Sequence, residues 1–211
     1  MDEYSVFYKL PELDNIGFSQ CFCGEKKLIK KKEIILGENN IRGLVGIMHS
    51  GLAFLQSIST SGEANILNYY EKGDLFGNVF VPAYNVNYYS VVAKTDCEIT
   101  LIDHDRLMNT CEKSCESHRQ LINNMVINNA GKSLVHIDIL SQRTIREKLI
   151  TYFKYLSVSR NTNEFQLPLS LSDLSNYISA DRSAMMRELR KLNDESIISS
   201  RSNKITLLKE L

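Results

Sequence analysis

Three arginines lie on a single predicted helix in the C-terminal part of the chain. At about 100° per residue, Arg187 and Arg190 share one side with Ser183 and Met186, and Arg182 lies in the first turn, from which it can lean forward. A guanidinium carries a rigid fork of donors, which matches O6 and N7 of guanine in a major groove and otherwise reaches phosphates. The opposite side is apolar and holds Met185, Leu189 and Leu192. The pattern indicates a helix that packs by one face and reads DNA with the other.

A second helical pattern precedes this helix and is joined to it by a tight turn. Apolar residues recur at helical spacing over 171–178, and Ser170 supplies an N-cap. The pattern breaks at 179–181, where Asp181 caps the next helix. Two helices joined in this way form a helix-turn-helix, in which Asp181–Asn193 is the recognition helix.

Two short β-like runs follow the recognition helix. Residues 197–200 and 204–207 flank a turn-like connection at 201–203, which is the pattern of the wing of a winged helix. This hairpin carries Arg201 and Lys204 and no acid, so its tip suits a phosphate backbone. The predicted DNA contacts are Ser170, Arg182, Ser183, Met186, Arg187, Arg190, Arg201 and Lys204.

Charge is distributed as a DNA-binding C-terminal domain requires. The whole chain balances 25 Lys or Arg against 25 Asp or Glu, but residues 142–211 hold 12 basic against 8 acidic residues. The longest uncharged runs are broken by Gly, Ser, Asn or Pro, and the first ten residues lack the order of a secretory signal. We therefore expect a cytoplasmic protein without a membrane span, in which the five cysteines are reduced.

The N-terminal part has the pattern of an antiparallel β-structure after a short helical lead-in over 1–20. Short apolar or alternating runs, split by Gly, Asn and Ser, predict a sandwich or barrel. The predicted strands are 26–29, 33–36, 44–49, 52–58, 64–70, 89–92 and 98–102.

The middle of the chain is helical in pattern, with a short helix over 105–112 and a long one over Ser117–Leu140. The stripe of the long helix comprises Leu121, Met125, Asn128 or Asn129, Lys132, Val135 and Ile139. Its length predicts pairing with the same helix of a second subunit, and burial within its own domain is the alternative. After a hinge at Ser141-Gln142, residues 145–156 predict an amphipathic helix that supports the recognition helix.

Four motifs then occur in the order in which one family carries them. They are Lys32–Asn39, His49–Gly51, the turn Gly73–Gly77 and the closing strand Ala93–Ile99. With the winged helix after them, the chain resembles the CRP/FNR family of bacterial transcription regulators over essentially its whole length. The resemblance implies an α+β fold: an N-terminal antiparallel β-roll (a double-stranded β-helix or jelly-roll), a long dimerisation helix and a C-terminal winged helix-turn-helix. The implied domains are 1–115, 116–141 and 142–211.

The resemblance also implies a mechanism. A small effector would bind the roll against the long helix and rotate the recognition helices of a homodimer on a pseudo-palindromic operator, where RNA polymerase is a further partner. Matched positions make Arg182, Ser183 and Arg187 base-reading residues. Ser183 stands where the family usually has a glutamate, so we expect an unusual operator. The implied effector pocket comprises Phe76, Gly77, Asn78, Val79, Tyr88, Tyr89, Ser90, Asn129, Lys132 and Ser133.

The segment Gly77–Ala93 lacks the charges that bind cyclic AMP in family members. Asn78 replaces the acid that takes the ribose hydroxyl, and the arginine that neutralises the phosphate falls on Asn87 or Tyr88. The segment holds no Lys or Arg, and burying an unpaired phosphate costs several kcal/mol. We expect an effector other than cyclic AMP. The aromatics of the segment favour an aromatic or weakly charged ligand, unless they are core residues.

Other inputs and another output stay open. A thiol or redox sensor would use cysteines, although the family's spacing for an iron-sulfur cluster is missing, and a haem sensor would need an axial histidine. The candidates are Cys21, Cys23, Cys97, Cys111 and Cys115, and His49, His104, His118 and His136. A further alternative is a winged helix that docks a protein, but Arg182, Arg187 and Arg190 favour DNA as the partner. No metal cluster, nucleophile elbow or phosphate loop is found in the sequence, so we expect no enzyme and predict no cofactor.

Overall fold

The computed structural model describes residues 24–59, 62–77, 89–108 and 116–209, so the lead-in predicted for 1–20 lies outside it. The chain divides into two compact units, Met1–Gly131 and Lys132–Leu211. The division falls inside a long helix, between the boundaries at 115 and 141 that the sequence suggests. Within the described residues, no helix has the length and apolar character needed to cross a membrane.

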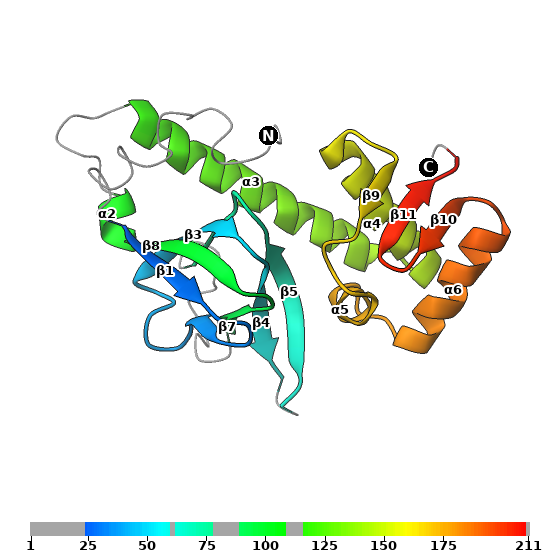
Figure 1. The fold of residues 1–211 in the computed structure, drawn as a ribbon, viewed down its shortest axis with the longest axis horizontal. Coiled ribbons are helices and arrows are strands. Elements are labelled where there is room, and N and C mark those ends of the chain that lie inside the picture. The colour runs from blue at the N-terminus through cyan, green and yellow to red at the C-terminus, as the bar shows by residue number, and fades with distance from the viewer. Residues whose placement is uncertain (1–23, 60–61, 78–88, 109–115, 210–211) are drawn as a thin grey trace. The chain divides into compact units, whose positions relative to one another are not determined.

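The first unit contains two four-stranded antiparallel sheets, with strand orders β1-β8-β3-β6 and β2-β7-β4-β5 (Figure 1). The strands are β1 (Glu25–Ile29), β2 (Ile34–Leu36), β3 (Leu44–Ser50), β4 (Ala53–Ile58), β5 (Ala64–Tyr70), β6 (Leu75–Gly77), β7 (Tyr89–Ala93) and β8 (Cys97–Asp103). All seven predicted strands are present, and the predicted antiparallel β-roll is confirmed. The additional strand, β6, lies within the Gly73–Gly77 motif, which the sequence presents as a turn.

The interior of the roll is apolar and closely packed. Tyr70 and Phe76 are fully buried, with ring centroids 5.4 Å apart. On β3, a Cβ added to Gly46 would lie 2.1 Å from the Phe76 ring, so only glycine leaves room for this aromatic side chain. Burial raises the pKa of the Tyr70 phenol, and among the described residues its hydroxyl has no hydrogen-bond partner.

The long helix is α3 (Glu116–Ser141), which follows α2 (His104–Met108). Two members of the predicted pairing stripe, Asn129 and Ile139, are buried. Among the described side chains of α3, the large exposed apolar ones are Ile127, Leu134, Ile137 and Leu140. At 100° per residue, the first three share an arc of about 80° on the opposite side of the helix. The helix therefore has apolar residues on both sides, and pairing through the Leu121–Ile139 stripe stays a prediction.

The second unit is a winged helix-turn-helix. Its elements after α3 are α4 (Ile145–Arg160), β9 (Glu164–Gln166), α5 (Leu171–Tyr177), α6 (Arg182–Asp194), β10 (Ile198–Arg201) and β11 (Lys204–Leu207). The three strands form an antiparallel sheet in the order β10-β11-β9. A capping box between Thr144 and Glu147 starts α4 just after the predicted hinge at Ser141-Gln142. The core of this unit includes Leu149, Phe153, Leu174, Met185, Leu189 and Leu192.

Candidate nucleic-acid interface

Each of the two helices α5 and α6 begins at a side-chain N-cap. Ser170 Oγ accepts a hydrogen bond from the Asp173 N–H at 3.2 Å and so starts α5. Ser179 has a φ of 50°, a left-handed conformation that turns the chain. Asp181 Oδ1 then accepts from the Ala184 N–H at 2.8 Å and starts α6. The predicted helix-turn-helix is confirmed, and Ser170 is an exposed N-cap at its beginning.

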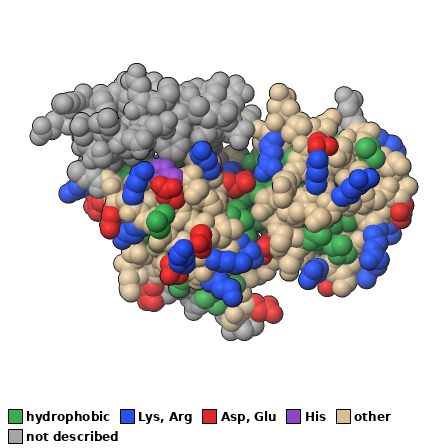
Figure 2. Space-filling view, in the orientation of Figure 1, with side chains coloured by type: hydrophobic (Ala, Val, Ile, Leu, Met, Phe, Trp, Pro, Cys, Tyr) green, Lys and Arg blue, Asp and Glu red, His purple; other side chains and the backbone are tan. Residues whose placement is uncertain are grey.

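The recognition helix α6 buries one face and exposes the other. Its buried residues are Met185, Leu189 and Leu192. The predicted reading residues Arg182, Ser183, Arg187 and Arg190 are exposed, and Met186 is half-buried. Lys and Arg side chains gather along the edge of the second unit that α6 forms (Figure 2). The first turn of the helix carries no acidic residue beyond its N-cap Asp181.

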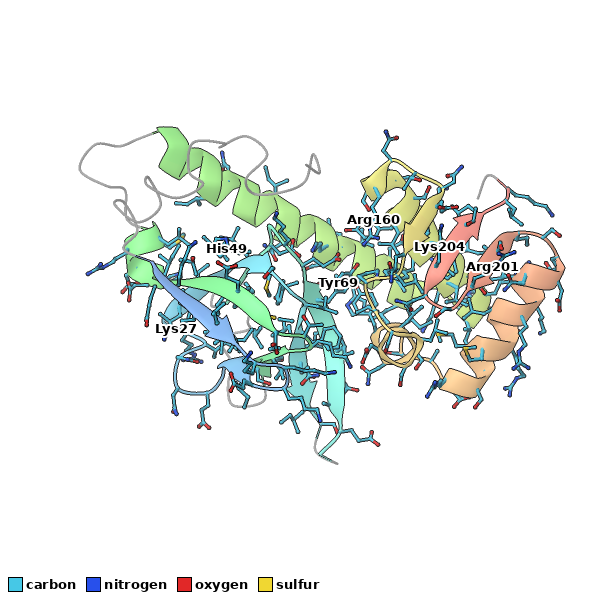
Figure 3. All side chains as sticks on the ribbon, viewed as in Figure 1. Lys27, His49, Tyr69, Arg160, Arg201 and Lys204 are labelled. Atoms are coloured by element: carbon cyan, nitrogen blue, oxygen red, sulfur yellow. The ribbon has the colours of Figure 1, made fainter. Side chains whose placement is uncertain are left out.

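The wing is the hairpin of β10 and β11, in which Arg201 pairs with Lys204 next to the turn (Figure 3). Both side chains belong to exposed residues. Lys204 Nζ lies 2.5 Å from Glu164 Oε1 on the neighbouring strand β9. The hairpin itself carries no acid, and the carboxylate that meets Lys204 comes from β9, a strand of three residues that the sequence did not predict.

A pair of charged residues links the start of α4 to the end of α6. Arg146 donates to both carboxylate oxygens of Glu195, with 2.9 Å between Nη1 and Oε1. The Arg146 guanidinium holds the pKa of the Glu195 carboxyl below its usual value. The two residues are 49 positions apart, so no local pattern in the sequence could have revealed the pair.

The residues predicted to line an effector pocket are only partly described. Phe76 and Gly77 are buried in β6, and Tyr89 and Ser90 are half-buried in β7. On α3, Asn129 is buried, Lys132 is half-buried and Ser133 is exposed. Asn78, Val79 and Tyr88 lie outside the described residues.

The described cysteine and histidines have ordinary structural surroundings. Burial raises the pKa of the Cys97 thiol, which donates to the carbonyl of Leu52 at 3.4 Å. His49 Nε2 lies 2.7 Å from the Thr100 hydroxyl. Among the described residues, no three His, Cys, Asp or Glu side chains gather where a metal ion could bind. Cys21, Cys23, Cys111 and Cys115 lie outside these residues, as does the side chain of His118.

An antiparallel β-roll followed by a long helix and a winged helix with an exposed arginine face defines a class of DNA-binding protein. Family models agree with both parts: residues 26–114 match the cyclic nucleotide-binding domain, and residues 147–210 match the Crp-like helix-turn-helix domain. The chain belongs to the CRP/FNR family, whose members are transcription regulators and not enzymes.

Named relatives and solved structures resemble the chain along most of its length. It is 24% identical to the anaerobic regulatory protein of Pasteurella multocida, over 94% of this chain and 72% of that protein. It is also 24% identical to the regulatory protein HlyX of Actinobacillus pleuropneumoniae, over 95% of this chain and 82% of that protein. A CooA mutant from Carboxydothermus hydrogenoformans shares the fold with a TM-score of 0.76 at 16% identity, over 95% of this chain and 91% of the other.

Proposed function

We propose that this chain is a homodimeric transcription regulator whose recognition helices bind a two-fold symmetric DNA operator. The observation that carries the proposal is the exposed face of α6, where Arg187 and Arg190 stand opposite a buried apolar stripe and Arg182 is exposed in the first turn. Phosphate contacts from the wing residues Arg201 and Lys204 position the helix, and the arginines of α6 read base edges. In a dimer of this kind, the half-sites lie about 34 to 36 Å apart, one helical turn of DNA.

Selection from a pool of random duplexes at low salt tests this function. We expect the full-length protein to retain DNA and to enrich a sequence with two inverted half-sites. Because Ser183 lacks a carboxylate, it cannot accept a hydrogen bond in the way a glutamate does from cytosine N4, so the enriched half-site should not depend on that contact. A protein that retains no duplex at low salt would contradict the proposal.

The exposed apolar residues of α3 support a homodimer. Ile127, Leu134 and Ile137 are 66%, 66% and 62% exposed, and they are spaced seven and three residues apart as in a heptad repeat. A seam of this kind is covered when the same helix of a second copy packs against it, because the patch is then self-complementary about a two-fold axis. We propose this face of the predicted Ser117–Leu140 pairing helix as the dimer contact.

We propose that the roll senses an effector other than cyclic AMP. The absence of Lys and Arg from the sequence between Gly77 and Ala93 supports this, since a cyclic phosphate needs a cation to offset its burial. Proteins of the same fold include a complex of CprK with OCPA and a regulator described as responsive to c-di-GMP. The fold is therefore compatible with more than one effector chemistry.

A redox or haem input is the second candidate. The relatives named as anaerobic regulatory proteins favour it. Native mass spectrometry of the purified protein, combined with an absorbance spectrum, separates the two inputs: a bound organic mass supports a small effector, and a visible band supports haem or iron-sulfur. We further propose that the DNA-bound dimer contacts RNA polymerase and that its site of action is the cytoplasm, where bacterial DNA lies.

A further inference from the structure

The side chain of Asn193, in the last turn of α6, connects the recognition helix to the wing. Its Nδ2 donates to the carbonyl of Leu189 and to the hydroxyl of Ser200, each at 2.8 Å. Its Oδ1 accepts from the backbone N–H of Ser200 at 2.7 Å. One half-buried amide therefore spans the last turn of α6 and the strand β10.

These partners fix the orientation of the amide. The backbone N–H of Ser200 can only donate, so it must face Oδ1, and the carbonyl of Leu189 can only accept, so it must face Nδ2. Aspartate would lack the donor, leucine would lack both groups, and glutamine would be one carbon too long for the same two contacts. The position therefore selects asparagine for its chemistry.

The location of this bridge matters because Ser200 immediately precedes Arg201. Along α6, Arg187 lies about 9 Å from Asn193, since six residues of a helix rise 1.5 Å each. The hydrogen bonds of Asn193 thus link the helix that carries Arg187 to the residue that precedes Arg201 at the wing turn. Without the bridge, β10 would keep its pairing with β11, and the backbone N–H of Ile197 would still donate to the Leu192 carbonyl at 3.0 Å, but the three hydrogen bonds of the Asn193 amide would be lost.

We propose that Asn193 is a positioning residue for DNA recognition, which holds the wing on the recognition helix so that Arg201 reaches a phosphate while α6 reads bases. The inference rests on the proposed function, since it assumes that α6 and the wing bind the same duplex. Asn193 does not itself touch DNA. Its effect is to make the contacts of the helix and of the wing simultaneous.

A double-mutant comparison with Arg201 tests this role through the salt dependence of DNA binding. In the native protein, Arg201→Ala should lower the slope of log affinity against log salt by about 1 for each wing, because one phosphate contact is lost. Asn193→Ala should lower the slope by at least the same amount, since Lys204 lies on the same wing, and adding Arg201→Ala should then change nothing. The preference for the selected duplex over one altered in its half-sites should persist, because α6 still reads the bases.

A second variant covers the case in which Asn193→Ala does not fold. In Asn193→Ser, the shorter hydroxyl can bond the carbonyl of Leu189, four residues earlier, but it cannot reach Ser200. Asn163→Ala is the matched control: its amide bonds the Ser157 hydroxyl at 2.9 Å but does not link α6 to the wing. In that variant, Arg201→Ala should lower the slope as it does in the native protein.

Two results would overturn the inference while leaving the proposed function intact. In the first, Arg201→Ala lowers the slope of log affinity against log salt in the Asn193 variants by as much as it does in the native protein. That result would show that the wing stays in place without the bridge. The second is an unchanged slope on Arg201→Ala in a native protein that binds DNA. A native protein that binds no DNA would instead overturn the proposed function.

Discussion

The imidazole of His136 lies parallel to the phenol ring of Tyr177, with ring centroids 4.0 Å apart and an interplanar angle of 7°. The Nε2 atom of His136 lies 2.8 Å from the backbone carbonyl oxygen of Tyr177, the last residue of α5. A carbonyl in the last turn of a helix has no acceptor role within the helix, so a donor from another element must satisfy it. Within the second unit, His136 thus attaches the end of α3 to the helix-turn-helix.

Replacing His136 should therefore destabilise the second unit. His136→Phe keeps an aromatic ring but leaves a buried carbonyl without its donor, which costs about 1 to 3 kcal/mol of unfolding free energy. His136→Ala should cost more, because the ring contact is lost as well. Urea denaturation measures both, and His104→Ala is the control, since that side chain lies in the first unit and bonds its exposed neighbour Asp105 at 3.1 Å. Equal stability of His136→Phe and the native chain would contradict this prediction.

The helix-turn-helix could be predicted from the sequence because its signals are local. The apolar residues of α6 recur with the helical period, and Ser170 and Asp181 lie at the N-caps where they were expected. Interactions between distant residues could not be predicted in this way. The strand β9 is recognisable only by its pairing with β11, and with it Glu164 was missed as the partner of Lys204.

The long helix shows a different limit. Its sequence has apolar residues on two sides, and the hydrophobic period is therefore satisfied by either side. Only burial distinguishes them: Ile139 is buried, whereas Leu134 and Ile137 are exposed. The predicted effector pocket could be tested neither by the hydrophobic pattern nor by burial, because residues 78–88, most of the 77–93 segment, lie outside the described residues.

Replacing Arg187 should change sequence preference. Arg187→Ala removes a bidentate contact to a base edge, so binding to the selected duplex should weaken by about 1 to 3 kcal/mol and one base position should become degenerate. Repeating the selection with the variant measures both effects. Lys154→Ala, which removes an exposed cation from α4, is the control and should leave the selected sequence unchanged. A variant that enriches the native operator with native affinity would show that Arg187 does not read bases.

The ion pair of Lys204 with Glu164 predicts an unusual gain of affinity. Glu164→Gln removes the carboxylate that competes with DNA for Lys204, so it should strengthen binding to every duplex and steepen the salt dependence. Lys204→Ala should weaken binding to all sequences alike and lower the salt slope by about 1 for each wing. When Lys204 is already replaced by Ala, Glu164→Gln should strengthen DNA binding only slightly, because it then removes only the long-range repulsion between the Glu164 carboxylate and DNA. Titrations over a salt series measure these slopes, and a Glu164→Gln variant that binds more weakly would contradict the prediction.

The pair of Arg146 and Glu195 predicts acid sensitivity of the second unit. Because Arg146 lowers the pKa of Glu195 in the folded protein, the pair contributes stability above the usual glutamate pKa and loses it as the pH falls through the lower folded value. The difference in unfolding free energy between the native chain and Glu195→Gln should thus be largest near neutral pH and vanish in acid. The Arg146→Gln background is the control, in which Glu195→Gln should make a smaller pH-dependent difference, because only the more distant charges of Lys191 and Lys209 then favour the carboxylate. A difference that grows on acidification would have the wrong sign.

The exposed apolar face of α3 predicts which residues hold the dimer together. Leu134→Glu places a carboxylate in the middle of the Ile127, Leu134 and Ile137 seam, where two copies would bring like charges together in an apolar contact. Sedimentation should then show a species of one chain, 24.1 kDa, where the native protein shows twice that mass. Leu28→Glu is the matched control, because Leu28 on β1 is 81% exposed and lies outside the seam. It should remain dimeric.

On a duplex with two half-sites, the Leu134→Glu variant should bind more weakly than the native protein and without cooperativity, because each recognition helix must then bind alone. A Leu134→Glu variant that sediments as the native dimer would place the dimer contact on another face.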